Sequence, residues 1–250
     1  MQGIQKTTVA GSAGRPPGCA FCMIYKSGLC IAAETEGASS NTSIEGHKNE
    51  ISVHTVHARQ MILHPRESSE FVTVICSGQA ISSIGLPDGR RQIFEILLPG
   101  DIIFWTVLFE PMSGRLTEAI DDSIYRKIKR VEFMALLAKQ PDFFKMFMRL
   151  SAYKKNQCDE LALTLGRRNA SQRIARLILD LAKRFAERGL MSDYTFRFSL
   201  RQRHIADATG LTPVHTSKIL RQLRRAKIID FEHRSLKIFD MTKLLQIAGP

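Results

Sequence analysis

The chain has 250 residues, of which 44% are hydrophobic and 24% are charged, and its formal net charge is +12. This is ordinary globular usage at a length typical of two packed domains, which excludes a wholly disordered or fibrous chain. No apolar run approaches the roughly 18 residues of a membrane-spanning helix, and residues 1–18 lack the apolar stretch of a secretory signal. We therefore expect a cytoplasmic protein with no membrane partner.

The positive charge is concentrated in the C-terminal part of the chain. Residues 1–150 carry a net charge of +1, whereas residues 151–250 carry +11. Such a surface attracts polyanions, because each phosphate that it neutralises releases condensed counterions. The distribution therefore predicts that a polyanion binds the C-terminal part.

Residues 1–18 are rich in Gly, Ser, Thr and Pro, and residues 34–47 form a second polar stretch. We therefore expect residues 1–48 to be a flexible segment with a cysteine cluster. The clustered thiols are Cys19, Cys22 and Cys30. Their spacing lets three soft thiolates converge on one zinc ion or iron–sulfur cluster, and either centre normally takes four ligands. Candidates for the fourth ligand are Cys76, Cys158 and His47. A vestigial site and a plain thiol pair are the alternatives.

A β-rich region follows, in which short apolar runs alternate with turn signals. Asp88-Gly89 lies between Ile81–Leu86 and Gln92–Leu98, and such a dipeptide favours a tight hairpin turn because Gly tolerates positive φ. The spacing predicts antiparallel strands that continue to about Ile128.

The apolar period becomes helical from Val131, and Pro141 is placed to begin a new helix. A stripe of residues then recurs at spacings of four, four, three and four, which places it on one helix face. The stripe comprises Leu150, Lys154, Cys158, Leu161 and Leu165. We expect Gly166 to interrupt this helix. Asn169 and Gln172 have the spacing of a capping box for the next helix, which Gly189 ends.

Two helices joined by a tight turn are predicted within 199–229. Ser199 is a candidate cap for the first helix, Gly210 supplies the turn, and Thr212 with Pro213 begins the second helix. Seven Lys and Arg residues stand against one acid within 199–227, which favours a DNA-binding motif over an ordinary helical hairpin. The expected DNA contacts are Arg203, Thr212, Pro213, Val214, His215, Ser217, Lys218 and Arg221. The apolar runs around His233-Arg234 fit a two-stranded wing.

Several motifs occur in an order that resembles the CRP/FNR family of transcription regulators, from about residue 50 to the end. The motifs are Gly78, Asp88-Gly89-Arg90, Pro99-Gly100-Asp101, Asn169-Ala-Ser-Gln-Arg-Ile-Ala and Arg203-His-Ile-Ala-Asp-Ala-Thr-Gly-Leu-Thr. The N-terminal cysteines and Arg184-Phe-Ala-Glu-Arg-Gly189 resemble the FNR and FixK branch.

The resemblance implies an α+β fold in four segments. The flexible segment 1–48 precedes an antiparallel β-roll sensor domain at 49–135, similar to a cyclic-nucleotide-binding jelly roll. A dimerisation helix at 136–168 and a winged helix-turn-helix domain at 169–250 follow. The implied protein is a homodimer and not an enzyme: it binds a palindromic promoter site in double-stranded DNA and responds to oxygen or redox state. It acts with RNA polymerase, as an activator or as a repressor.

Three departures from the family pattern bear on this interpretation. Ser113-Gly114 replaces the Arg-Ser pair that holds a cyclic-nucleotide phosphate, with Arg115 one step displaced, so no cyclic AMP is expected. The segment 119–128, where the fourth cysteine of an iron–sulfur cluster would lie, contains none. Val214 replaces a base-reading Glu, and Lys218 stands where Arg is usual.

Two alternatives remain open at this point. Cys158 is either a small buried hydrophobe or a redox-sensitive thiol at a two-fold interface. The whole chain is alternatively a small-ligand binding module whose β-roll holds a cyclic nucleotide or heme.

Overall fold

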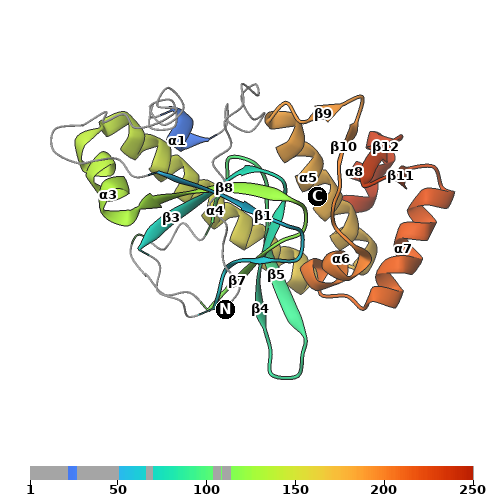
Figure 1. The fold of residues 1–250 in the computed structure, drawn as a ribbon. Helices are drawn as coiled ribbons and strands as arrows, with labels where there is room; N and C mark the ends of the chain where they lie inside the picture. The colour runs from blue at the N-terminus through green and yellow to red at the C-terminus, as the bar shows by residue number, and fades with distance from the viewer. Residues whose placement is uncertain (1–21, 27–50, 66–69, 104–107, 109–113, 250) are drawn as a thin grey trace. The chain divides into compact units, whose positions relative to one another are not determined.

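The computed structural model describes residues 22–26, 51–65, 70–103, 108 and 114–249. The chain divides into two compact units, and Figure 1 labels their elements. Unit 1 comprises Met1–Ala80 and Leu97–Ser151, and unit 2 comprises Ile81–Ile96 and Ala152–Pro250. The predicted α+β fold is confirmed, with antiparallel strands followed by long helices and a helix-turn-helix. None of the described helices is long and apolar enough to cross a membrane.

Unit 1 contains a four-stranded antiparallel sheet in the order β1-β8-β3-β6. These strands are β1 (Ser52–Val56), β8 (Ser123–Lys129), β3 (Phe71–Ser77) and β6 (Ile102–Ile103). In the same unit, strand β2 (Met61–Leu63) pairs antiparallel with strand β7 (Leu116–Ala119). Gly78 follows β3 with a φ of +82°, and a Cβ there would lie 2.2 Å from the Ser123 hydroxyl oxygen, so the turn admits only glycine.

The core of unit 1 lies between this sheet and two helices. These are α3 (Arg130–Lys139) and the first half of α4 (Pro141–Arg167). Three phenylalanines, Phe133, Phe143 and Phe147, meet edge to face with ring centroids 5.2 and 6.0 Å apart. They pack with the buried strand residues Val72, Val74 and Ile128. The short helix α1 (Met23–Lys26) contributes Met23 to the same cluster.

Helix α4 begins at Pro141, as the sequence predicted. The expected interruption lies one residue beyond Gly166: α4 ends at Arg167, and the Arg168 amide still donates to the Thr164 carbonyl at 3.3 Å. A single exposed glycine costs a helix only about 1 kcal/mol, which the continuing hydrogen bonds offset.

The predicted hairpin is confirmed and belongs to unit 2. Its strands are β4 (Ala80–Gly85) and β5 (Arg91–Leu97). Gly89 has a φ of +84° in the turn, and the Leu86 amide donates to the Arg90 carbonyl at 2.7 Å.

The rest of unit 2 packs helices against a second four-stranded sheet. Helix α5 (Ala170–Glu187) begins at the predicted capping box, in which Asn169 and Gln172 bond each other's backbone amides at 3.1 and 2.9 Å. The sheet has the order β11-β12-β10-β9. Its strands are β9 (Met191–Ser192), β10 (Thr195–Arg197), β11 (Ile229–Glu232) and β12 (Ser235–Ile238). Helix α8 (Met241–Ala248) packs on α5, and the Phe185 and Phe196 rings stack at 4.9 Å.

Candidate nucleic-acid interface

Two helices and a tight turn form the basic motif of unit 2. Helix α6 (Gln202–Thr209) ends at Gly210, whose φ of +65° and ψ of 34° are left-handed. Thr212 then caps α7 (Pro213–Arg225) by accepting a hydrogen bond from the His215 amide at 3.2 Å. Pro213 occupies the first helical position, where its missing N–H costs nothing. The turn and the start of α7 are therefore confirmed.

One face of α7 is buried and holds the helix in place. Ile219, Leu220 and Leu223 are buried, as are Ile205 and Ala206 of α6. This packing determines which side of α7 is turned to solvent.

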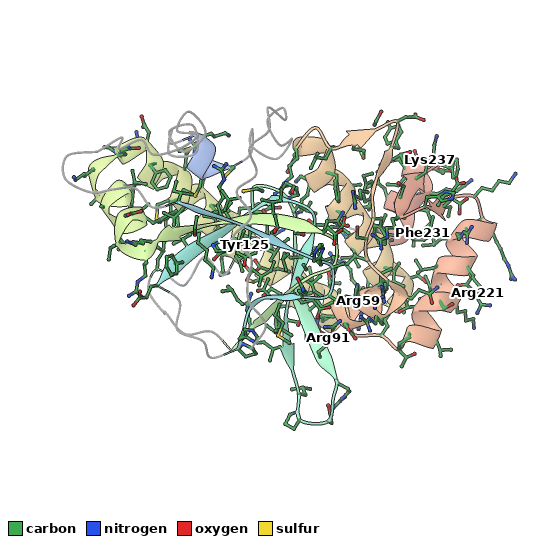
Figure 2. The ribbon with its side chains drawn as sticks, viewed as in Figure 1. Arg59, Arg91, Tyr125, Arg221, Phe231 and Lys237 are labelled. Carbon is green, nitrogen blue, oxygen red and sulfur yellow. The ribbon has the colours of Figure 1, made fainter. Side chains whose placement is uncertain are left out.

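The opposite face of α7 carries the predicted DNA contacts. Val214 is 79% exposed, and Lys218 and Arg221 are also exposed at spacings of four and three residues. Figure 2 labels Arg221 on α7. The remaining exposed members of the predicted set are Arg203, Thr212, Pro213 and His215, and Ser217 is half-buried. The structure therefore presents a small apolar side chain, a hydroxyl and two cations along one helix face.

The predicted cap at Ser199 is wrong. The chain remains extended past this residue, because the Phe198 amide donates to the Arg234 carbonyl at 2.6 Å and both Phe198 and Leu200 are buried. Arg201 is the residue that precedes α6, and its amide donates to Nδ1 of His204 at 3.2 Å. The sequence did not predict His204, at the third helical position, as the residue that accepts the Arg201 amide hydrogen.

The His204 ring is held neutral beneath this interface. Burial, together with the nearby charges of Arg203, Arg91 and Arg201, lowers the pKa of His204 from 6.5 to about 4. The uncharged ring is able to accept the Arg201 amide hydrogen.

The single acid of this segment, Asp207, is engaged by the β4–β5 hairpin. Arg91 Nε donates to Asp207 Oδ2 at 2.7 Å, and the Gln92 side-chain amide donates to the Ala208 carbonyl at 3.2 Å. The pairing neutralises Asp207, so the exposed face of the motif stays cationic. Sequence reasoning missed this contact, since no local signal connects the hairpin to α6.

A second basic projection is the turn between β11 and β12. Glu232 pairs with Ser235, so His233 and Arg234 form a two-residue loop with φ values of 45° and 63°. Both residues are exposed. These strands lie where the sequence predicted a wing, and β9 and β10, which the sequence did not predict, extend the sheet.

The predicted stripe of α4 does not lie on one open face. Leu150 packs against the core of unit 1, and Lys154 is 2% exposed with its Nζ 2.9 Å from Glu95 Oε1. Leu161 and Leu165 are half-buried, whereas Cys158 is exposed. A different set of apolar side chains is open on α4: Phe144, Met148 and Leu163 are 48–50% exposed. A periodic pattern alone could not distinguish these two faces.

The predicted cysteine site lies mostly outside the described residues. Cys19 and Cys30 are among the residues not described, and Cys22 is buried in the apolar core of unit 1. Within the described ranges, no group of three or more Cys, His, Asp or Glu residues is arranged to hold a metal ion. Ser113, which stands where related proteins hold a cyclic-nucleotide phosphate, also lies outside the described ranges. The described thiols do not assemble a ligand set for a cluster.

A cavity of about 600 Å³ lies inside unit 2, beside the buried Lys154. Its cations are already bonded: Arg173 donates to the carbonyls of Arg168, Leu165 and Thr209, and Arg184 donates to the Ile96 carbonyl at 2.7 Å. Because these guanidinium groups donate to backbone carbonyls, they stabilise the packing of the segments that line the cavity.

Comparison with known proteins agrees with this geometry. Residues 172–247 match the family described as the Crp-like helix-turn-helix domain. The chain is 27% identical to the transcriptional activator protein FnrL of Cereibacter sphaeroides over 92% of both chains. It is 26% identical to the fumarate and nitrate reduction regulatory protein of Escherichia coli over 70% of both chains.

Solved structures share this fold. FixK2 from Bradyrhizobium japonicum superimposes with a TM-score of 0.73 at 25% identity, covering 80% of this chain and 98% of that one. The CRP-family regulator TTHB099 from Thermus thermophilus superimposes with a TM-score of 0.64 at 22% identity, covering 78% and 96%.

Proposed function

Because the chain is a CRP/FNR-type transcription regulator of the FNR and FixK branch, and not an enzyme, we propose that it binds a palindromic promoter site as a homodimer. The observation that carries the proposal is the exposed face of α7, which offers Val214, Ser217 and Lys218 beside a buried packing face. A recognition helix presents such a face to base edges in the major groove. Arg203 and Arg221 supply phosphate contacts.

The direct test is selection of DNA by the purified protein. We expect selection from duplexes with a randomised central region to yield two inverted half-sites. The centres of these half-sites should lie about 10 base pairs apart, as two-fold symmetry requires. A selected site without inverted symmetry would remove the palindrome from the proposal. Binding of small ligands without any preferred DNA would instead favour the ligand-module alternative.

The open apolar face of α4 supports the dimer. Phe144, Met148 and Leu163 expose about half of their side-chain surface, and a second copy of α4 would cover them. Cys158 is exposed on the same helix and would come near its counterpart across the two-fold axis. The face proposed for pairing is therefore shifted around the helix from the predicted stripe.

Sedimentation tests this face with a matched pair of variants. Met148→Asp should give monomers, because a charge replaces an apolar contact, whereas Met134→Asp, at a 39% exposed methionine of α3, should leave the dimer intact. Mild oxidation should also link two parent chains through Cys158, since a disulfide needs Cα atoms within about 7 Å. An intact dimer of Met148→Asp without any Cys158 crosslink would exclude this face.

We propose that the regulator responds to oxygen or redox state and activates RNA polymerase at its promoters. Support comes from relatives named anaerobic regulatory protein and transcriptional activator protein, and from the thiols of Cys19, Cys22 and Cys30. Transcription from a selected promoter with purified polymerase, with and without oxygen, tests both statements. Equal transcript in the two atmospheres would exclude oxygen as the signal, and less transcript with the regulator than without it would make the protein a repressor.

A further inference from the structure

The exposed face of α7 does not end with the predicted base contacts. Val214, Lys218, Arg221 and Arg225 follow one another at spacings of four, three and four residues, and all four are exposed. Eleven residues make three helical turns, so Arg225 points in nearly the same direction as Val214, about 16 Å further along the axis. The DNA-facing stripe therefore continues to the C-terminal end of the helix.

That end of the helix borders a cationic groove, which we call the terminal groove. It encloses about 620 Å³ and is lined by Arg221, Arg224, Arg225, Lys227, Ile229, Asp230 and Phe239. Its acid is neutralised within the groove, because Arg224 Nε donates to Asp230 Oδ1 at 2.7 Å. Arg221, Arg225 and Lys227 therefore leave the groove with an excess of three positive charges.

Cations in the last turn of a helix also complement its dipole, which accounts for part of this cluster. Lys227 lies beyond the helix and is not explained in that way. Its φ is +52°, a conformation in which glycine or asparagine is the usual residue after a helix. The Lys227 amide donates to the Arg224 carbonyl at 2.9 Å, which keeps the residue next to the groove. The chain thus places a third cation where local geometry favours an uncharged residue.

We propose that the terminal groove binds backbone phosphate of DNA that flanks each half-site. This inference rests on the proposed function, with the first turns of α7 in the major groove. The major groove is about 12 Å wide, so a stripe of about 16 Å reaches past the base edges to the phosphates that border them. Phe239 is 58% exposed in the groove and offers an apolar surface to deoxyribose.

The salt dependence of binding tests the inference. The variant Arg225→Gln/Lys227→Asn removes two cations per protomer, and Asn keeps a residue that tolerates positive φ at position 227. If four phosphate contacts are lost per dimer, the slope of log affinity against log salt should become shallower by about 3–4. The order of preferred sequences should not change, since phosphate contacts position the protein without reading bases.

A matched control removes the same charge elsewhere. Lys139→Gln/Lys183→Gln deletes two exposed lysines that lie on α3 and α5, away from α7 and from the α4 face proposed for pairing. Its slope should stay close to that of the parent. Ethylation of single phosphates should weaken the parent at flanking positions and have no such effect on the Arg225→Gln/Lys227→Asn variant.

A slope equal to that of the parent would overturn the inference. If transcription by purified polymerase fell while the slope stayed the same, an acidic protein surface would be the occupant instead. A parent protein that binds DNA without sequence preference would refute the proposed function itself, whereas specific binding with unchanged slopes refutes only the terminal groove.

Discussion

Arg91 and Asp207 are 116 positions apart in the chain, yet Arg91 Nε lies 2.7 Å from Asp207 Oδ2. Both side chains are largely buried, with exposed fractions of 21% and 26%. The pair fastens the β4–β5 hairpin to the first helix of the DNA-binding motif. Because Asp207 is neutralised there, it does not repel the phosphates that α7 is proposed to approach.

We expect Arg91→Ala to lower the free energy of unfolding by about 1–2 kcal/mol, because a charged hydrogen bond is lost from a partly buried site. Asp207→Asn should cost a similar amount. Urea titration of the parent, both single variants and the double variant measures the coupling. Additive losses would mean that the two side chains do not interact in solution.

Lys154 and Glu95 form a more deeply buried pair, with 2% and 14% of their side chains exposed. Lys154→Met should destabilise the protein by about 3 kcal/mol, since it removes the cation that pairs with the largely buried Glu95 carboxylate. Adding Glu95→Gln should recover a large part of the loss. Thermal unfolding measures these effects. A variant Lys154→Met that keeps its stability but becomes monomeric would restore this residue to the dimer interface, where the sequence placed it.

Local chemistry predicted much of the fold. Asp88-Gly89 marked the hairpin, Asn169 with Gln172 marked the start of α5, and Thr212-Pro213 marked the start of α7, because each depends on a few neighbouring residues. Periodicity could not predict the partners of these elements. The stripe through Leu150 mixes core and cavity positions, since a helix that packs on both sides has more than one regular face.

The candidate site was predicted in outline because its residues are also close together in the sequence. The exposed set from Thr212 to Arg221 follows from helical spacing and charge. The contact of Arg91 with Asp207 joins distant segments, and strands of two and three residues, such as β9 and β10, carry too few residues for a pattern. Ser199 was misplaced because burial of Phe198 and Leu200 outweighs its preference for a cap.

The neutral state of His204 predicts a pH dependence of stability. Its pKa in the folded protein is lowered to about 4, so between pH 6.5 and 4 the unfolded chain binds a proton that the folded chain does not. The free energy of unfolding should therefore fall as the pH decreases through this window, and the contribution should be complete above about pH 6.5. His204→Gln should flatten the curve.

The control for this measurement is His233→Gln at the exposed turn between β11 and β12, where the side chain is 91% exposed. It should leave the pH dependence of the parent in place. If the free energy of unfolding of the parent did not change between pH 6.5 and 4, protonation of the His204 ring would not destabilise the folded protein.

The N-terminal thiols predict a metal centre that depends on each ligand. Protein purified without oxygen should contain iron and absorb visible light, and Cys22→Ser should lose both, because the ligands bind cooperatively. Cys158→Ser, at an exposed thiol of α4, tests one candidate for the fourth ligand: loss of iron would identify Cys158 as a ligand, and retained iron would exclude it. Iron analysis and an absorption spectrum are sufficient. A colourless, iron-free parent would refute the cluster, and one equivalent of zinc would replace it with a structural site.

Val214 predicts how the protein reads its half-site. Valine offers only apolar contact, most usefully to a thymine methyl group, whereas Glu accepts from the amino group of cytosine. Val214→Glu should therefore change the base pair selected at one position of each half-site. A direct contact is worth roughly 1–3 kcal/mol of discrimination, and a symmetric dimer makes it twice. Selection from a randomised palindrome at fixed salt measures the change.

Two further variants separate reading of bases from general affinity. Lys218→Ala should weaken binding, because its cation donates to guanine or phosphate from the next turn of the helix. Val131→Glu, at a 70% exposed valine of α3, introduces the same charge outside the interface and should select the parental sequence. If Val214→Glu also selected the parental sequence with undiminished discrimination, the N-terminal turn of α7 would not face the bases, and the groove would have to be read from another part of unit 2.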